Sequence, residues 1–136
     1  MMAYFDTNVL LYAFAKNIDD DKQGEISTKL IENAIKNDSL IVSEIILCEF
    51  AFVSKKIDEN IADIDNNLDF LSTFLKPSNF TVTQRILEIF KHKSLYASSF
   101  DIYHLAFAEY HDAKLVTFDK GFKKLRSLSK VEIDIL

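Results

Sequence analysis

The sequence has 136 residues, 49% of them apolar and 27% charged, which is typical of one ordinary globular domain with a core of its own. Sixteen basic and 21 acidic residues give a net charge of −5, which argues against a passive nucleic-acid-binding module, because such modules are usually basic. A single cysteine, Cys48, excludes an internal disulfide framework, and together with three scattered histidines it offers no zinc-ligand spacing.

The first half of the chain alternates between strand-like and helix-like stretches. Residues 2–5 predict a short apolar strand, and residues 8–15 predict a buried helix that is apolar on every side. Apolar side chains at helical spacing between residues 26 and 35 predict an amphipathic helix. Residues 40–42 predict a second strand, and residues 45–53 predict a nearly all-apolar, largely buried helix.

The second half continues this alternation. Apolar residues at helical spacing between positions 61 and 75 predict another amphipathic helix, which we expect to stop near Pro77. Residues 80–82 predict a short strand or an extended link. Helices are then expected over residues 84–93 and 100–112.

Two further strands complete the pattern, at residues 115–117 and, with alternating apolar side chains, at residues 131–135. Strands separated by helices predict one α/β domain over residues 1–136, with a parallel sheet and helices on both faces. Two glycines exclude a Gly-rich phosphate-binding loop, and there is no Gly-x-Ser-x-Gly motif. We expect no membrane span and no signal peptide, because no apolar run is long enough and the N-terminus lacks a basic segment.

Two aspartates lie where predicted strands end. Asp6 follows the first strand and Asp119 follows the third. Open α/β sheets bind ligands at the carboxyl ends of their strands, so both carboxylates are candidates for a functional site. Each also has a simpler structural role: Asp6 can cap the next helix, and Asp119 can form a turn before Gly121. Thr117 can add a hydroxyl to the same cleft.

Two further acids lie on apolar helices. Glu49 is the only charge in IILCEFAFVS, so we expect it to be enclosed and to need a partner, either a cation or a salt bridge. Asp101 lies near the start of another apolar helix, where Ser98 or Ser99 can supply the cap. A simpler role for Asp101 is to interact with the helix dipole. His104, one turn later, is expected to orient a neighbour or to belong to the core rather than to bind metal.

Together these four acids predict a metal site. Carboxylates that converge on one cleft repel each other strongly, so such a site is stable only when partly protonated or bound to metal. Oxygen ligands select hard cations, which here means Mg²⁺ or Mn²⁺. Such an ion orients a water molecule, lowers the pKa of that water and stabilises charge on a phosphate group in transfer. This chemistry needs no cysteine or serine nucleophile.

Three stretches carry a family resemblance: YFDTNVLLYAF, VSEIILCEFAFV and FDIYHLAFAEYHDAKLVTFDKGF. In this order they resemble PIN-domain ribonucleases, and within that family they are most similar to the VapC-type toxins of bacterial and archaeal toxin–antitoxin pairs. The matching stretches span almost the whole chain. The most specific of them is the closing unit, in which Asp101 and a helix are followed by LVTFDKGF.

The resemblance implies a PIN-like three-layer α/β/α fold with a central parallel sheet. It implies a metal-dependent endoribonuclease that uses Mg²⁺ or Mn²⁺ and cuts tRNA or rRNA. The family's four acidic positions, catalytic and metal-binding, fall on Asp6, Glu49, Asp101 and Asp119. Asn8 and Thr117 match supporting polar positions. The implied partners are the RNA substrate, a small antitoxin protein and a second copy of the chain in a homodimer; the lone cysteine suits a cytoplasmic location.

The segment 114–130 partly offsets the acidic balance, because it holds six basic residues against one acid. The candidates for binding RNA phosphates are Lys120, Lys123, Lys124 and Arg126. A solvated helix face explains these charges equally well.

Two features depart from the family pattern. Many relatives have a glycine before the third strand, where this chain has Asp112 and Ala113, which affects a turn and leaves the chemistry in place. The acidic run at residues 19–21 is unusual for a surface near RNA, and is expected to be a solvated loop or to face the antitoxin.

Three other functions remain open at this point. A housekeeping RNA-processing nuclease of the same fold would use the same acids. A phosphotransfer domain with Asp6 as acceptor also has an aspartate at a strand end, but a dehalogenase-like enzyme needs a second aspartate where this chain has Asn8. A non-catalytic interaction domain would not need all four acids.

Overall fold

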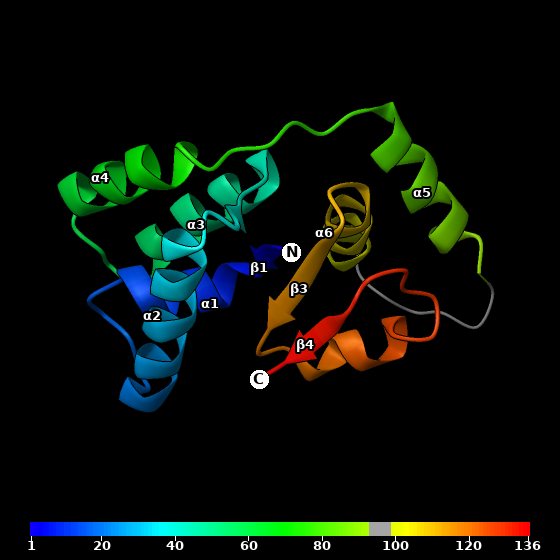
Figure 1. The fold of residues 1–136 in the computed structure, drawn as a ribbon. Helices are drawn as coiled ribbons and strands as arrows, with labels where there is room; N and C mark the ends of the chain where they lie inside the picture. The colour runs from blue at the N-terminus through cyan, green and yellow to red at the C-terminus, as the bar shows by residue number, and fades with distance from the viewer. Residues whose placement is uncertain (93–98) are drawn as a thin grey trace.

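Four parallel strands form the central sheet of the computed structural model, which describes residues 1–92 and 99–136 (Figure 1). The strands are β1 (Met2–Phe5), β2 (Leu40–Ile41), β3 (Ala113–Thr117) and β4 (Ile133–Ile135). Their order is β2-β1-β3-β4, and Phe5 on β1 lies beside Val116 on β3. Because the two central strands are parallel neighbours, the residues that follow them, Asp6 and Asp119, leave the sheet at the same edge.

Helices cover both faces of the sheet, so the predicted three-layer α/β/α fold is confirmed. In the described part of the chain they are α1 (Thr7–Phe14), α2 (Asp21–Lys36), α3 (Glu44–Lys56), α4 (Ile61–Ser72), α5 (Phe80–Phe90), α6 (Ser99–Tyr110) and the 3-10 helix η1 (Lys120–Leu125). Figure 1 shows α1 to α4 grouped on one side and α5 with α6 on the other. Tyr4, Phe50 and Phe107 are among the fully buried side chains between the layers. None of the described helices is long and apolar enough to cross a membrane.

The stretch 80–82 is helical, and the prediction of a strand or link there is wrong. Asn79 caps α5, because its side-chain oxygen accepts hydrogen bonds from the backbone N–H groups of Thr81 and Val82. This capping interaction starts the helix four residues earlier than the apolar spacing indicates. The helix end expected at Lys93 and the candidate cap Ser98 lie outside the described residues.

The helix predicted to reach residue 75 ends earlier, at Ser72. Leu75 leaves the helix and forms an isolated parallel bridge with Val42. The backbone N–H of Val42 donates to the carbonyl of Phe74 at 3.0 Å, and that of Lys76 donates to the carbonyl of Val42 at 2.9 Å. Leu75 therefore extends the edge of the sheet rather than the helix.

One face of α3 is more exposed than predicted. The buried residues of the helix, Ile46, Phe50 and Ser54, recur every four positions and face the core. On the other side Cys48 is exposed, and the Phe52 side chain is 66% exposed. The expectation of a largely buried helix is wrong, because the outer apolar residues of α3 line a groove instead of a core.

The acidic run at residues 19–21 is exposed and lies where the loop before α2 enters the helix, so the expected solvated loop holds for Asp19 and Asp20. Asp20 is the N-cap of α2, and Asp21 is its first residue. Negative charge is favourable there, because the N-terminal end of a helix carries partial positive charge. Asp19 accepts a hydrogen bond from the Tyr12 hydroxyl at 2.5 Å, which raises the pKa of Tyr12 to about 12.

Three helices are followed by an aspartate with a left-handed backbone. Asp38 (φ 53°), Asp58 (φ 60°) and Asp112 (φ 50°) come after α2, α3 and α6. Glycine is the usual residue at this position, because a Cβ atom strains the left-handed conformation. Asp112, which the resemblance singled out at the start of the third strand, therefore lies on a strained backbone position.

Replacing Asp38 by glycine is expected to raise the free energy of unfolding by about 0.5–1 kcal/mol. Glycine relieves the backbone strain, and it also removes a negative charge from the C-terminal end of α2, where the helix dipole disfavours one. Asp38→Ala removes the same charge but keeps the Cβ atom, so it should be less stable than Asp38→Gly. Urea denaturation of the two variants measures the difference, and equal stability would contradict the strain at this position.

Candidate active site

A groove with a volume of about 590 Å³ opens beside the end of β1. Three of the four predicted acids line it: Asp6, Glu49 and Asp101. The remaining lining residues are Thr7, Asn8, Ile45, Cys48, Phe52, Val53 and Phe100. The lining of the groove therefore combines three carboxylates with apolar side chains, and it comes from α1, α3 and α6.

Asp6 both caps α1 and contributes to this groove. Its Oδ1 accepts the backbone N–H of Thr7 at 2.8 Å, so the helix-cap role considered from the sequence does occur. Its Oδ2 accepts the hydroxyl of Thr117 at 2.9 Å. The Thr117 oxygen in turn accepts the backbone N–H of Asp119 at 2.9 Å. Thr117 therefore links the ends of the two central strands.

Asp119 is not among the described residues that line the groove. It is exposed and caps η1, with its Oδ1 accepting the backbone N–H of Gly121 at 2.8 Å. The turn role considered for this residue therefore does occur. Thr117 connects Asp119 to Asp6 by hydrogen bonds, but the four carboxylates do not all line the same groove.

Glu49 is half-buried rather than enclosed, with 31% of its side chain exposed. Its Oε1 lies 2.7 Å from Nε2 of His104 and also accepts the hydroxyl of Thr7 at 3.1 Å. Burial acts to raise the pKa of the Glu49 carboxyl, but the hydrogen bond and charge of His104 and the hydrogen bond from Thr7 lower it further, so the net pKa lies below its ordinary value. Glu49 is therefore a carboxylate at neutral pH.

His104 lies one turn after Asp101 on α6 and is only 1% exposed. Its Nδ1 is 2.6 Å from the hydroxyl of Tyr4, which lies 2.8 Å from Oγ of Ser43. This position fits the expectation that His104 is a core or orienting residue. The contributions of Tyr4 and Ser43 were missed, because no spacing in the sequence relates them to residues on α6.

The donor set around the groove is all oxygen, which suits a hard divalent cation. In residues 1–92 and 99–136, however, no cluster of three or more acidic, histidine or cysteine side chains could hold a metal ion. Magnesium in proteins is usually held by one or two carboxylates together with several waters. Asp6 and Glu49 fit that mode, because Thr7 hydrogen-bonds to both of them.

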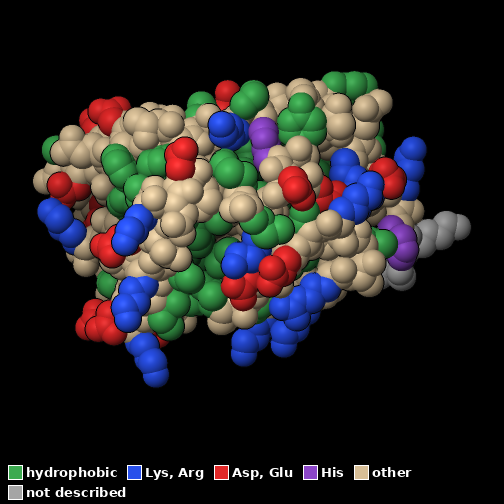
Figure 2. Space-filling model, in the orientation of Figure 1, with side chains coloured by type: hydrophobic (Ala, Val, Ile, Leu, Met, Phe, Trp, Pro, Cys, Tyr) green, Lys and Arg blue, Asp and Glu red, His purple; other side chains and the backbone are tan. Residues whose placement is uncertain are grey.

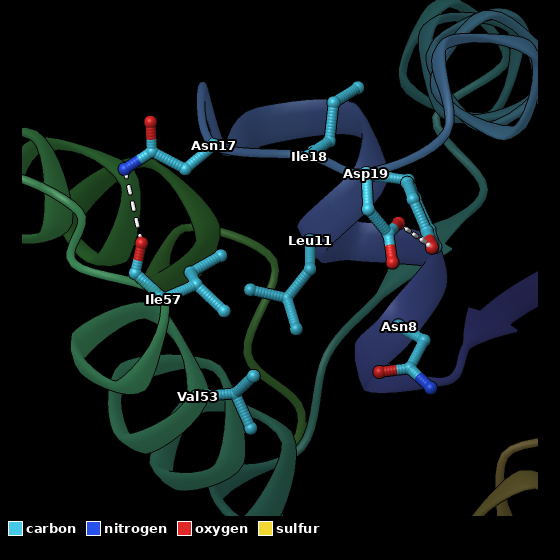
Figure 3. Close-up of a pocket in the computed structure, with 8 residues that line it drawn as sticks. Asn8, Leu11, Asn17, Ile18, Asp19, Val53 and Ile57 are labelled. Atoms are coloured by element: carbon cyan, nitrogen blue, oxygen red, sulfur yellow. Dashed lines mark hydrogen bonds between the residues drawn. The ribbon is translucent and has the colours of Figure 1, made fainter.

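A second hollow of about 230 Å³ adjoins the groove and shares Asn8 and Val53 with it. Figure 3 shows Leu11 and Val53 pointing toward one another across it, near the hydrogen bond from Asn17 to the carbonyl of Ile57. That bond fixes the loop that forms one wall of the hollow.

The buried carboxylate of Glu59 accepts hydrogen bonds from the same loop. Its two carboxylate oxygens accept the backbone N–H groups of Lys16 and Asn17 at 2.6 and 3.1 Å. The loop between α1 and α2 is therefore anchored to the end of α3 by both side-chain and backbone groups.

The four predicted RNA-binding residues lie on or beside η1, directly after Asp119. Lys120, Lys123, Lys124 and Arg126 are all exposed. Figure 2 shows basic side chains gathered at the lower edge of the molecule, in the region where Figure 1 draws η1. None of these four residues lines the groove itself.

Comparison with known proteins connects this geometry to a family. The family model of the PIN domain matches residues 3–128. The fold is similar to that of a chain in the crystal structure of VapBC2 from Rickettsia felis bound to a DNA fragment from the promoter, with a TM-score of 0.72 and 21% identity over 100% of this chain and 99% of that one.

A second similar structure is a toxin–antitoxin complex from Klebsiella pneumoniae. Its TM-score is 0.62, with 22% identity over 88% of this chain and 89% of that one. No curated protein matches the sequence.

Proposed function

Because the chain belongs to the PIN-domain family, we propose that it is a divalent-metal-dependent endoribonuclease and the toxin of a toxin–antitoxin pair. The observation that carries the proposal is the acidic groove, which Asp6, Glu49 and Asp101 line beside the end of a central strand. Nucleases with PIN domains generally use divalent metal ions, which agrees with the oxygen donors of this groove.

In this proposal Asp6, Glu49 and Asp101 would hold Mg²⁺ or Mn²⁺ together with waters, and Asp119 would add a ligand from the end of β3. Such an ion, when bound, would supply an activated water and offset charge on the phosphate group. Glu49 is ionised, and because its Oε1 already accepts two hydrogen bonds within the described residues, Oε2 is the oxygen that would contact the ion. Thr117 keeps the Asp6 carboxylate oriented.

The substrate we propose is RNA with unpaired bases, such as the loops of tRNA or rRNA. The Phe52 and Phe100 rings are 66% and 53% exposed on the groove wall, where bases can stack on them. Asn8, exposed at the groove edge, can hydrogen-bond to the RNA backbone. The RNA phosphates beyond the groove would contact Lys120, Lys123, Lys124 and Arg126.

The partner we propose is a small antitoxin protein, and the setting is the cytoplasm, with the chain acting as a homodimer. One of the two similar structures is a toxin–antitoxin complex and the other is VapBC2 with promoter DNA, which supports the choice of an antitoxin as the partner. Expression of the chain alone in bacteria should then arrest growth.

Incubation of the purified protein with tRNA and with rRNA fragments tests the function. We expect discrete cleavage products in Mg²⁺ or Mn²⁺, no cleavage in excess EDTA, and full recovery when Mg²⁺ is added back in excess. Cleavage that continues under full chelation would contradict the metal mechanism and would indicate acid–base catalysis instead. A protein that cuts none of these RNAs with either metal ion would contradict the nuclease assignment.

A further inference from the structure

A continuous run of hydrogen bonds extends from the groove into the core behind Glu49. The Glu49 carboxylate contacts Nε2 of His104 at 2.7 Å, and Nδ1 of the same ring contacts the Tyr4 hydroxyl at 2.6 Å. Tyr4 contacts Ser43 Oγ at 2.8 Å, and Ser43 accepts the backbone N–H of Ile46 at 3.1 Å. The run thus connects β1, α3 and α6, and only its Glu49 end reaches the groove.

The run can be read in two directions, because a hydroxyl can both donate and accept. At its inner end Ser43 Oγ accepts the backbone N–H of Ile46, and Tyr4 is the described acceptor within reach of the Ser43 hydroxyl hydrogen. In the direction that uses this acceptor, Ser43 donates to Tyr4, Tyr4 donates to Nδ1 of the imidazole, and Nε2–H donates to Glu49. Burial raises the pKa of Tyr4 well above its usual range, so its hydroxyl keeps the proton that it donates. In this direction each contact of the run joins one donor to one acceptor, and the chain of donors ends on the Glu49 carboxylate.

The opposite direction satisfies these groups less well. If Nδ1 carried the proton, a lone pair on Nε2 would face the Glu49 carboxylate at 2.7 Å, unless an additional proton were bound. The Ser43 hydroxyl hydrogen would also lose Tyr4 as its acceptor. The contacts therefore favour a single tautomer of His104, with the proton on Nε2.

The burial of these polar side chains indicates that their hydrogen bonds do more than stabilise the fold. Tyr4 and Ser43 are 0% exposed and His104 is 1% exposed. An apolar core of similar shape generally does at least as well for stability as a buried polar network. What the polar network supplies is orientation, because each hydrogen bond fixes the side chain before it.

We propose that His104, Tyr4 and Ser43 are positioning residues that hold Glu49 with Oε1 turned into the protein and Oε2 presented to the groove. Both hydrogen bonds of Glu49 within the described residues end on Oε1, which is consistent with this arrangement. Glu49 thus offers a single oxygen to the reaction and does not act as a bidentate ligand. The proposal rests on the nuclease function proposed above.

The variant that tests the proposal is Tyr4→Phe, which removes one hydroxyl and keeps the ring that packs 4.8 Å from Phe107. We expect kcat for RNA cleavage to fall about 10-fold, the lower end of the range for residues that orient a ligand, with KM unchanged. Tyr103→Phe is the matched control, since Tyr103 stacks on the same Phe107 ring outside the run and should keep its kcat. Equal rates for Tyr4→Phe and wild type, or equal losses in both variants, would overturn the proposal.

A second measurement does not depend on activity. Nitrogen NMR shifts of the imidazoles, assigned to His104 by loss of its signals in His104→Gln, report which ring nitrogen carries the proton. We expect Nε2–H in the wild type and a mixture of tautomers in Tyr4→Phe; Nδ1–H in the wild type would overturn the proposal. If the wild type cuts no RNA but shows the expected tautomers, the nuclease assignment fails while the orienting network stands.

Discussion

Replacing Asp6 by asparagine is expected to lower the rate of RNA cleavage by at least about 100-fold while the protein stays folded. The substitution removes the charge that attracts the metal ion but keeps the shape of the side chain. Asparagine is as good a helix N-cap as aspartate, so the bond from the Thr7 backbone to position 6 is retained. The Thr117 hydroxyl, which donates to Asp6, can instead accept from the new amide.

The chain offers a matched control for this experiment in Asp20. Asp20 is also the N-cap of a helix, since it accepts the backbone N–H groups of Lys22 and Gln23, but it does not line the groove. Asp20→Asn should therefore cleave RNA at the wild-type rate. Rates are measured on the same RNA in Mg²⁺, with thermal melts to verify folding. If Asp6→Asn remained as active as Asp20→Asn, Asp6 would be a helix cap and nothing more.

Replacing Arg85 by methionine is expected to destabilise the protein by about 3–5 kcal/mol, the range for removing one partner of a buried ion pair. The Arg85 side chain is 14% exposed and that of Glu109 is 6% exposed. Two guanidinium nitrogens bind the carboxylate at 2.6 and 3.1 Å, and one of them also donates to the carbonyl of Leu128 at 2.8 Å. Methionine fills the space but leaves the Glu109 carboxylate with only the backbone N–H of Lys130 as a described donor.

Two further variants distinguish the loss of the buried ion pair from the loss of charge as such. Glu88 also pairs with Arg85, at 2.9 Å, but its side chain is 67% exposed, so Glu88→Gln should change the stability by only a few tenths of a kcal/mol. In the double variant Arg85→Met with Glu109→Met, no buried charge is left alone, and the loss should be smaller than for Arg85→Met by itself. Chemical denaturation measures these variants together with the single variant Glu109→Met. A double variant as unstable as the sum of its single variants would show that the two residues do not act as a pair.

The sheet could be predicted from the sequence because local features specify it. Each strand is a short apolar stretch beside a helix, and this alternation allows few arrangements other than a parallel sheet with helices on both faces. The positions of Asp6 and Asp119 after strands could be predicted for the same reason, since the ends of these strands are visible in the sequence. The spacing of Asp101 and His104 indicated only that they share one side of a helix.

The parts that could not be predicted depend on contacts between distant residues. His104 is 55 residues from Glu49 and 100 residues from Tyr4 in the sequence, and no local pattern relates them. The exposed side of α3 was also missed, since Phe52 and Cys48 look like core residues until the groove is known. At residues 80–82, β-branched and aromatic residues favoured a strand, but the cap from Asn79 determined the outcome.

The pairing of β1 with β3 has a consequence for the time at which activity can begin. Asp6 and Thr117, which meet at the end of these strands, are 111 residues apart in the sequence. At about 5–20 residues per second, a ribosome needs roughly 5–20 s to reach the second after making the first. During that interval β1 lacks a neighbour on one side, and the hydrogen bond that orients Asp6 cannot form. If the chain is the nuclease proposed above, its site cannot be complete, and it cannot cut RNA, until β3 has been made.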